Sequence, residues 1–379
     1  MIKRTILEPL KEALQPGKVV ILYGPRRVGK TTLLKEIEAS LALEGKYVDG
    51  EENSVQSALS SGDSLSLQKF LGSTELLIVD EAQQIPQIGK NLKLLVDHFP
   101  KLRILASGSA SFSLAQQVGE PLTGRKKTLH LFPLSLQELT LELGFEKQPI
   151  LMRENLLIYG GYPEAFILSY AKRAAYLKEI VDSYLFRDIL ALEDIRNAKK
   201  IRDLLTLLAF QIGQEVSLSE LGNRLDVHKD TVCRYLDLLE KSFVLLNVRG
   251  FSRNLRNEVT KTSRYYFFDN GIRNALINNF NPVELRDDIG QLCENFLAME
   301  RIKKQSYENI LSNNYFWRTY DQQEIDWVEE REGKLFGYEF KWSKNKRNVH
   351  APKKWQTAYP NALFECITPE NYQGFIGAD

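Results

Sequence analysis

The segment that most constrains the fold is GPRRVGKT at residues 24–31, which fits the pattern G-x-x-x-x-G-K-[ST]. It follows the apolar run KVVILY at residues 18–23 and overlaps the start of residues 30–43, whose apolar spacing is that of a helix. A loop between a buried strand and a helix can wrap its backbone N–H groups around a phosphate, which the helix N-terminus also faces. The residues expected to line the phosphates are Gly24, Pro25, Arg26, Arg27, Val28, Gly29, Lys30, Thr31 and Thr32.

Two side chains of this loop and two acids further along have the chemistry of ATP hydrolysis. Lys30 is expected to reach the β- and γ-phosphates, and the Thr31 hydroxyl to bind Mg²⁺. A second apolar run, ELLIVD at residues 75–80, ends in Asp80 and is followed by Glu81. At the carboxyl end of a strand, Asp80 would help to hold Mg²⁺, and Glu81 would act as general base on the attacking water. The sequence therefore predicts an ATPase that uses ATP and Mg²⁺.

A third apolar run, at residues 102–106, leads into the serine-rich segment 107–111. Because apolar runs alternate with helical patterns, we expect an α/β domain with a parallel sheet. A small polar side chain at the end of this strand, Ser109 or Ser107, would contact the γ-phosphate or the water. The same residues are equally consistent with an ordinary serine-rich turn.

Composition excludes several classes of protein. The 379 residues are 43% hydrophobic and 26% charged with a net charge of +1, which suits a globular chain of several domains and identifies no partner. The three cysteines are too widely spaced for a metal site or a disulfide framework. No apolar run approaches the roughly 18 residues that span a bilayer, and the N-terminus lacks a signal-peptide core. We expect a cytoplasmic protein without a membrane partner.

A helix-turn-helix pattern lies between residues 216 and 241, with a Ser cap at its start. Residues 229–241 form its second helix, which in such motifs enters the major groove of DNA. The outward side of this helix is expected to show Lys229, Asp230, Thr231, Arg234 and Tyr235. A strand-like run at 244–248 leads to a basic segment containing Arg249, Arg253, Arg256, Lys261 and Arg264. This winged-helix pattern predicts DNA contact through phosphates; the alternative is packing or protein interaction.

The segments 324–330 and 335–341 both have the pattern of strands, and residues 331–334 between them form a turn with Gly333. If Glu330 pairs with Leu335, Asp326 falls opposite Glu339. Opposed residues place their Cβ atoms about 4.5–5.5 Å apart. Two carboxylates at that separation repel each other unless a cation lies between them.

The chain resembles the prokaryotic AAA-type ATPases that carry a C-terminal domain related to restriction-endonuclease-like nucleases. The matching segments cover nearly the whole chain in order. They are GPRRVGKTTLL (24–34), LLIVDEAQ (76–83), LASGSAS (105–111), LTGRKKTLHLFPLSLQEL (122–139), GGYPEAF (160–166), YYFFDNGIRNAL (265–276), EIDW (324–327) and GYEFKWS (337–343).

The resemblance implies a domain order and an oligomer. The expected domains are an AAA core at 1–140, a helical lid at 141–198, a winged helix at 199–264 and a nuclease-like α/β domain at 265–379. By analogy with the family, Arg125 looks like an arginine finger that acts on a neighbouring subunit, which would require a homo-oligomer. A solvated basic loop with Lys126 and Lys127 is the alternative for Arg125.

The acids of the end domain are similar to the PD-(D/E)xK nuclease pattern. The resemblance gives Glu294, Asp326 and Glu339 as Mg²⁺ ligands, and Lys341 as the group that orients water or steadies the phosphate charge. Related domains also keep the fold after losing cleavage, because fold does not determine function.

Two hypotheses for the whole chain follow. In the first, an AAA-type ATPase acts on DNA, as a ring-forming motor with an attached metal-dependent nuclease-like domain. In the second, ATP controls a protein partner in a signalling or defence switch, and the end domain is an inactive scaffold. The basic segment and the acidic hairpin favour the first.

Overall fold

The computed structural model describes residues 2–108, 122, 124–143, 149–185, 198–252, 263–342 and 349–377. The chain divides into two compact units. Residues 1–133 with 241–243 form the first, and residues 134–240 with 244–379 form the second.

The first unit is built on a five-stranded parallel sheet in the order β2-β3-β4-β1-β5. Its strands are β1 (Val19–Tyr23), β2 (Gly45–Asp49), β3 (Leu76–Asp80), β4 (Arg103–Gly108) and β5 (Lys126–His130). Every residue of β1 and β3 is buried, whereas β2 and β5 lie at the edges and are partly exposed. The parallel α/β sheet expected from the three apolar runs is confirmed.

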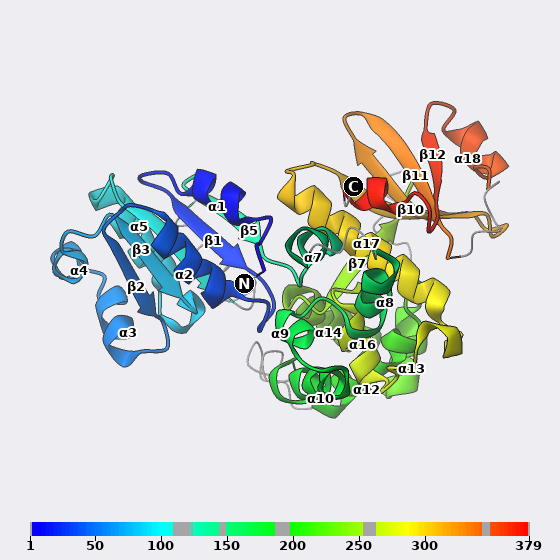
Figure 1. Cartoon of the computed structure of the whole chain (residues 1–379), viewed down its shortest axis with the longest axis horizontal. Helices are drawn as coiled ribbons and strands as arrows, with labels where there is room; N and C mark the ends of the chain where they lie inside the picture. The colour runs from blue at the N-terminus through cyan, green and yellow to red at the C-terminus, as the bar shows by residue number, and fades with distance from the viewer. Residues whose placement is uncertain are drawn as a thin grey trace. The chain divides into compact units, whose positions relative to one another are not determined.

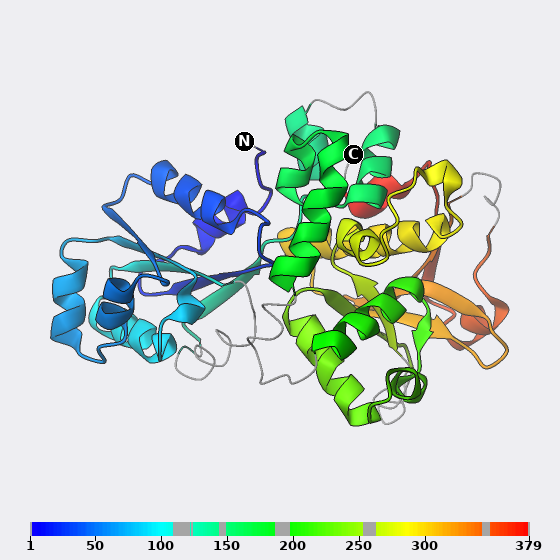
Figure 2. The same cartoon turned by 90° about the horizontal axis from the view of Figure 1, so that it is seen from below.

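Helices cover both faces of this sheet, as Figures 1 and 2 show in blue and cyan. They are α1 (Leu7–Ala13), α2 (Lys30–Ser40), α3 (Asn53–Leu59), α4 (Ser64–Leu71) and α5 (Ile88–His98), with the short 3₁₀ helix η1 (Ala82–Gln84) after β3. Ile88, Leu92 and Leu95 of α5 share a core with alternate side chains of β1 and β3. A sheet buried on both faces needs strands that are apolar throughout, which is why the central strands form continuous apolar runs.

The second unit contains a seven-stranded mixed sheet in the order β12-β11-β10-β9-β7-β8-β6. Its strands are β6 (Glu215–Val216), β7 (Leu245–Gly250), β8 (Ser263–Phe267), β9 (Asn313–Arg318), β10 (Glu324–Arg331), β11 (Lys334–Phe340) and β12 (Leu363–Ile367). Strand β7 pairs antiparallel with β8 and parallel with β9. Strands β6, β7 and β8 therefore share one sheet with the end strands β9 to β12. The boundary expected at residues 264–265 falls inside β8. The four-domain division otherwise stays a prediction.

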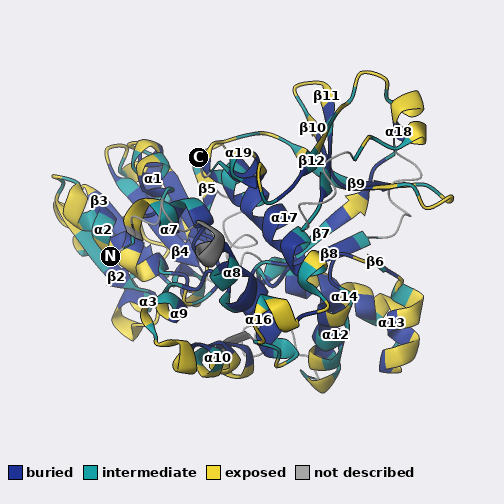
Figure 3. Cartoon of the chain, turned by 45° about the vertical axis from the view of Figure 1, so that its right-hand side comes forward, coloured by how far each residue is buried: buried dark blue, intermediate teal, exposed yellow. Residues whose placement is uncertain are grey.

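Helices surround this second sheet. They are α7 (Leu136–Leu143), α8 (Pro149–Tyr159), α9 (Pro163–Ile167), α10 (Tyr170–Glu179), α12 (Ala198–Phe210), α13 (Leu218–Leu225), α14 (Lys229–Lys241), α16 (Asn270–Leu276), α17 (Ile289–Tyr307), α18 (Lys353–Ala358) and α19 (Tyr372–Ile376), with the π-helical turn η3 (Ile180–Leu185) and the 3₁₀ turn η4 (Val283–Leu285). Helix α17 is buried along most of its length, as Figure 3 shows in dark blue. Across the described residues, no helix has both the length and the apolar character that crossing a membrane requires.

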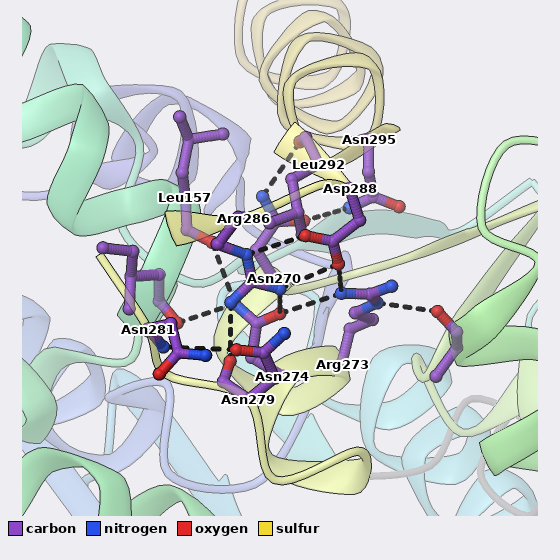
Figure 4. A network of polar contacts seen from close by, with 12 residues as sticks. Leu157, Asn270, Arg273, Asn274, Asn279, Asn281, Arg286, Asp288, Leu292 and Asn295 are labelled. Atoms are coloured by element: carbon purple, nitrogen blue, oxygen red, sulfur yellow. Dashed lines mark hydrogen bonds and ion pairs between the residues drawn. The ribbon is translucent and has the colours of Figure 1, made fainter. Parts of the chain in front are cut away.

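Two of the motifs noted in the sequence meet inside this unit. Asp269 caps α16 by accepting a hydrogen bond from the Ile272 N–H at 3.1 Å, and its other oxygen accepts from the Gly161 N–H at 2.6 Å. Asn274 of α16 donates to the carbonyls of Leu157 and Ile158 at the end of α8 (3.0 and 2.8 Å; Figure 4). The GGYPEAF and YYFFDNGIRNAL segments therefore join α8 to α16.

Gly160 tests this junction because its φ is +69° and a Cβ there would collide with the Asp269 carboxylate. Gly160→Ala should lower the free energy of unfolding by about 3 kcal/mol, from the overpacking and from the left-handed backbone. Gly333→Ala is the matched control, since its φ is +70° and no atom lies within 4 Å of the added Cβ. It should cost only about 1 kcal/mol. Equal losses in urea unfolding would contradict the steric argument.

Candidate functional site

The phosphate loop follows β1 and ends where α2 begins at Lys30. Gly29 has φ +97°, and a side chain on Gly24 would collide with the Leu131 carbonyl, so both positions require glycine. Lys30 is 5% exposed, and its ammonium donates to the carbonyls of Gly24 and Pro25 at 3.0 and 2.9 Å. The loop therefore has the close backbone approach and the helix N-terminus that a phosphate site needs.

Arg4 supports the loop from behind. Its buried guanidinium donates to the Val28 carbonyl at 2.8 Å and to the Phe132 carbonyl at 2.6 Å. These bonds tie the loop to the segment that follows β5. The sequence contains no motif that would have shown this contact, because Arg4 lies before the first apolar run.

Asp80 is the centre of the site. One of its oxygens accepts from the Thr31 hydroxyl at 2.6 Å and from the Tyr47 hydroxyl at 2.8 Å. The other accepts from the Ser107 hydroxyl and from the Glu81 N–H at 3.1 Å. Residues from α2, β2 and β4 thus converge on one carboxylate, which brings Thr31 and Asp80 together as predicted.

These hydrogen bonds decide the charge of Asp80. Burial favours the neutral acid, but the bonds from Ser107, Thr31 and Tyr47 outweigh it and lower the pKa of Asp80. A cleft of about 450 Å³ adjoins the carboxylate and is lined by residues that include Tyr47, Asp49 and Glu81. An ionised carboxylate beside an open cleft and a hydroxyl is suited to bind Mg²⁺.

Glu81 has a left-handed backbone, with φ 46° and ψ 42°, which is uncommon for a residue with a side chain. Its carboxylate accepts a hydrogen bond from the Gln83 amide. Strain of this kind persists where the surrounding structure imposes it, and it is concentrated at functional sites. The fold therefore places Glu81 beside Asp80 at the carboxyl end of β3.

Ser107, Ser109 and Arg125 were also predicted for the nucleotide site, and their positions differ. Ser109 lies outside the described residues, whereas Ser107 contacts Asp80. Arg125 is half-exposed and pairs with Asp97. Its role as an arginine finger stays a prediction.

The second group of predicted residues lies on the end strands. Glu330 pairs with Leu335 and Trp327 with Tyr338, which confirms the predicted register. Asp326 and Glu339 are the next residues of the two strands beyond the last of these pairs. The two central residues of the turn, Glu332 and Gly333, have φ of 52° and 70°, the left-handed values of a type I′ hairpin.

Arg264 of β8 lies among these acids with a side chain only 4% exposed. Its guanidinium is 2.9 Å from Glu324, 3.5 Å from Glu294 and 3.6 Å from Asp326. The Tyr266 hydroxyl donates to Glu294 at 2.7 Å, and Lys341 contacts Glu339 at 2.5 Å. Among the described residues, no three His, Cys, Asp or Glu side chains are grouped so as to hold a metal ion. The donor set therefore does not fit the expected Mg²⁺.

Burial governs the protonation of these carboxyl groups. It raises the pKa of Glu294 to about 8, with a further contribution from Asp326 and opposition from Arg264. Burial and Asp326 raise the pKa of Glu339 to about 7, while Lys341 opposes the shift. Burial also raises the pKa of Asp326, against the Phe340 N–H and Arg264.

The helix-turn-helix segment is formed by α13 and α14. Ser217 is the cap, because its hydroxyl accepts from the Glu220 N–H at 3.3 Å. Two expectations for the DNA-facing surface are wrong: Tyr235 is 5% exposed and packs in the core, and Arg264 is buried among acids. Of the other basic residues of the segment, Arg249 is exposed on β7, whereas Arg253, Arg256 and Lys261 lie outside the described residues.

Comparison with known proteins gives three family matches. Residues 16–140 match the family described as AAA domain, residues 152–283 match a domain of unknown function (DUF8612), and residues 289–368 match another (DUF4143). The nuclease-like relation of the end strands therefore stays a prediction.

Relatives match over most of their length. An uncharacterized protein of Mycobacterium tuberculosis is 30% identical over 343 residues, 89% of this chain and 74% of that protein. An uncharacterized protein of Methanocaldococcus jannaschii is 24% identical over 373 residues, 93% of this chain and 81% of that protein. A Walker-type ATPase of Pyrococcus abyssi, among the solved structures, is 17% identical with a TM-score of 0.49, covering 73% of this chain and 96% of that chain.

The parallel sheet, its phosphate loop and the match at residues 16–140 define a P-loop ATPase fold of the AAA type. The chain belongs to the same family as the Mycobacterium tuberculosis protein.

Glu294 gives a pH prediction for the second unit. Since its pKa is raised from 4.5 in the unfolded chain to about 8 in the fold, the folded state binds the proton more tightly. Stability should therefore fall as the pH rises from 4.5 towards 8. Glu294→Gln stays neutral, so its free energy of unfolding, measured with urea, should depend less on pH. The control is Glu330→Gln, at an exposed acid on β10, which should keep the pH dependence of the wild type. Parallel curves for wild type and Glu294→Gln would refute the assignment.

Proposed function

We propose that this chain binds ATP with Mg²⁺ and hydrolyses it. The observation that carries the proposal is the hydrogen bond of 2.6 Å between Thr31 and Asp80, at the end of a phosphate loop. A hydroxyl and a carboxylate at that place are the two protein ligands that hold Mg²⁺ in P-loop enzymes. The match to an AAA domain supports the same conclusion.

Each residue of the site has a distinct role in this proposal. Thr31 and Asp80 would hold Mg²⁺, which supplies charge neutralisation at the phosphates when bound. Lys30 exchanges its contacts with the Gly24 and Pro25 carbonyls for phosphate oxygens. Glu81 accepts the proton of the attacking water, and Tyr47 and Ser107 keep Asp80 ionised and oriented.

Substitution separates binding from turnover. Glu81→Gln should retain ATP binding and lose hydrolysis by at least about a hundredfold, because an amide does not accept the proton. Lys30→Ala should weaken ATP binding about tenfold or more, because the phosphate charge loses its partner. Fluorescent-nucleotide titration and phosphate release are the measurements. Glu75→Gln, an acid just before β3, is the control and should behave as wild type. A normal rate in Glu81→Gln would remove Glu81 as the base.

The finer hypothesis is that this ATPase acts on DNA. It rests on the basic segment that begins in β7, where Arg249 is exposed. The charges of the exposed side chains of α14 cancel, because Lys229 and Arg234 are matched by Asp230 and Asp237. That helix therefore adds no net attraction for phosphates. The alternative remains a switch that acts on a protein partner. Metal-dependent cleavage is not included in the proposal, because Arg264 lies among the acids.

An ATPase assay with single-stranded, duplex and branched DNA separates these two hypotheses. If the chain acts on DNA, the rate should rise with at least one of them. Arg253→Ala/Arg256→Ala should then weaken DNA binding similarly across DNA sequences. For duplex DNA, each lost phosphate contact should reduce the slope of the logarithm of the binding constant against the logarithm of salt concentration by about 0.9. Arg224→Ala, an exposed arginine on α13, is the control. An unchanged rate with every DNA would favour the protein partner.

A further inference from the structure

The acid cluster of the second unit is formed by Glu294 of α17 with Glu324 and Asp326 of β10, and a cation already lies inside it. Arg264 reaches all three carboxylates within 3.6 Å, and its side chain is 4% exposed. An arginine side chain is always charged in proteins. The cluster is therefore compensated by a residue of the chain itself.

Two oxygens of the cluster also accept hydrogen bonds from donors other than Arg264. Glu294 Oε1 accepts from Tyr266 at 2.7 Å and faces Arg264, and Asp326 Oδ2 accepts from the Phe340 N–H at 2.9 Å. A divalent ion needs several oxygens converging at about 2.0–2.6 Å. An ion at this place would meet both the guanidinium charge and oxygens that are turned towards other donors.

Arg264 is held in place by its surroundings as well as by charge. Its guanidinium carbon lies 4.6 Å from the centre of the Phe316 ring on β9. Its backbone belongs to β8, which pairs with both β6 and β7. One side chain thus links β8, β9, β10 and α17.

We propose that Arg264 is the resident cation of the Glu294, Glu324 and Asp326 cluster, and that it closes this cluster to divalent ions while joining β8 to the end strands. The cluster is then a structural ion-pair centre with the acids of a metal site and a guanidinium in place of the metal. This inference is independent of ATP hydrolysis, which concerns the first unit.

Direct metal binding is the first test. Full-length protein carrying Asp80→Asn, so that the nucleotide site contributes less, is stripped with EDTA and titrated with Mn²⁺ by electron paramagnetic resonance. We expect Asp80→Asn and Asp80→Asn/Asp326→Asn to bind the same amount of Mn²⁺, because the cluster holds none. Mn²⁺ binding that Asp326→Asn abolishes would overturn the proposal.

Charge compensation is the second test. Arg264→Met in EDTA should raise the unfolding constant by at least about a hundredfold, because it leaves buried acids without a partner. Arg264→Met/Asp326→Asn should recover a large part of this loss. Arg331→Met is the matched control: Arg331 also pairs with an acid, Glu329 at 3.0 Å, and lies over Phe336, but Arg301 still compensates Glu329 at 2.6 Å. It should change the unfolding constant far less.

Two outcomes of the stability test would contradict the proposal. One is an Arg264→Met variant as stable as wild type. The other concerns the case in which Arg264→Met does not accumulate as folded protein, and it is read from Arg264→Met/Asp326→Asn. Recovery of folded protein by Asp326→Asn supports the proposal, and equal loss in both variants contradicts it.

Discussion

A buried charge is costly unless an opposite charge or several hydrogen bonds compensate it, and the second unit is organised around this constraint. In α17, Arg301 makes a two-point contact with the buried Glu329 at 2.6 and 2.9 Å, and Lys303 pairs with Glu300. Asp288 accepts two bonds from Arg286 at 2.8 Å and a further bond from Arg273 (Figure 4). Because each group is satisfied in one arrangement of the helices, these pairs favour a single packing over others.

The same constraint is met differently at the two acid sites. Asp80 accepts its hydrogen bonds from hydroxyls and a backbone N–H, which are neutral donors. They hold the carboxylate ionised without supplying a positive charge, so the site can still gain from a bound cation. The carboxylates around Arg264 already have their cation. Two sites that the sequence suggested as Mg²⁺ sites because of their acids therefore differ in what they can bind.

The sequence showed the centre of each sheet better than its edges. Strands β1, β3 and β4 are mostly buried and form continuous apolar runs, whereas β2 (GKYVD) and β5 (KKTLH) are partly exposed and do not. Tyr47 was missed for this reason, since it lies on an edge strand that no apolar run marks. The register of β10 with β11 could be predicted, because a two-residue turn determines all the pairs that follow.

The position of Arg264 could not be predicted, and the reason is topological. Its neighbours in the sequence suggested a solvated basic segment, but β7 pairs in parallel with β9, so only β7 separates β8 from the end strands and the Arg264 side chain can reach β9 and β10. A parallel pairing across more than sixty positions, such as Arg249 with Tyr315, leaves no local pattern in the sequence. It also means that β6 and β7, the strands on either side of the helix-turn-helix segment, belong to one sheet with the end strands. A displacement of any one of these strands would therefore act on the strands of both parts together.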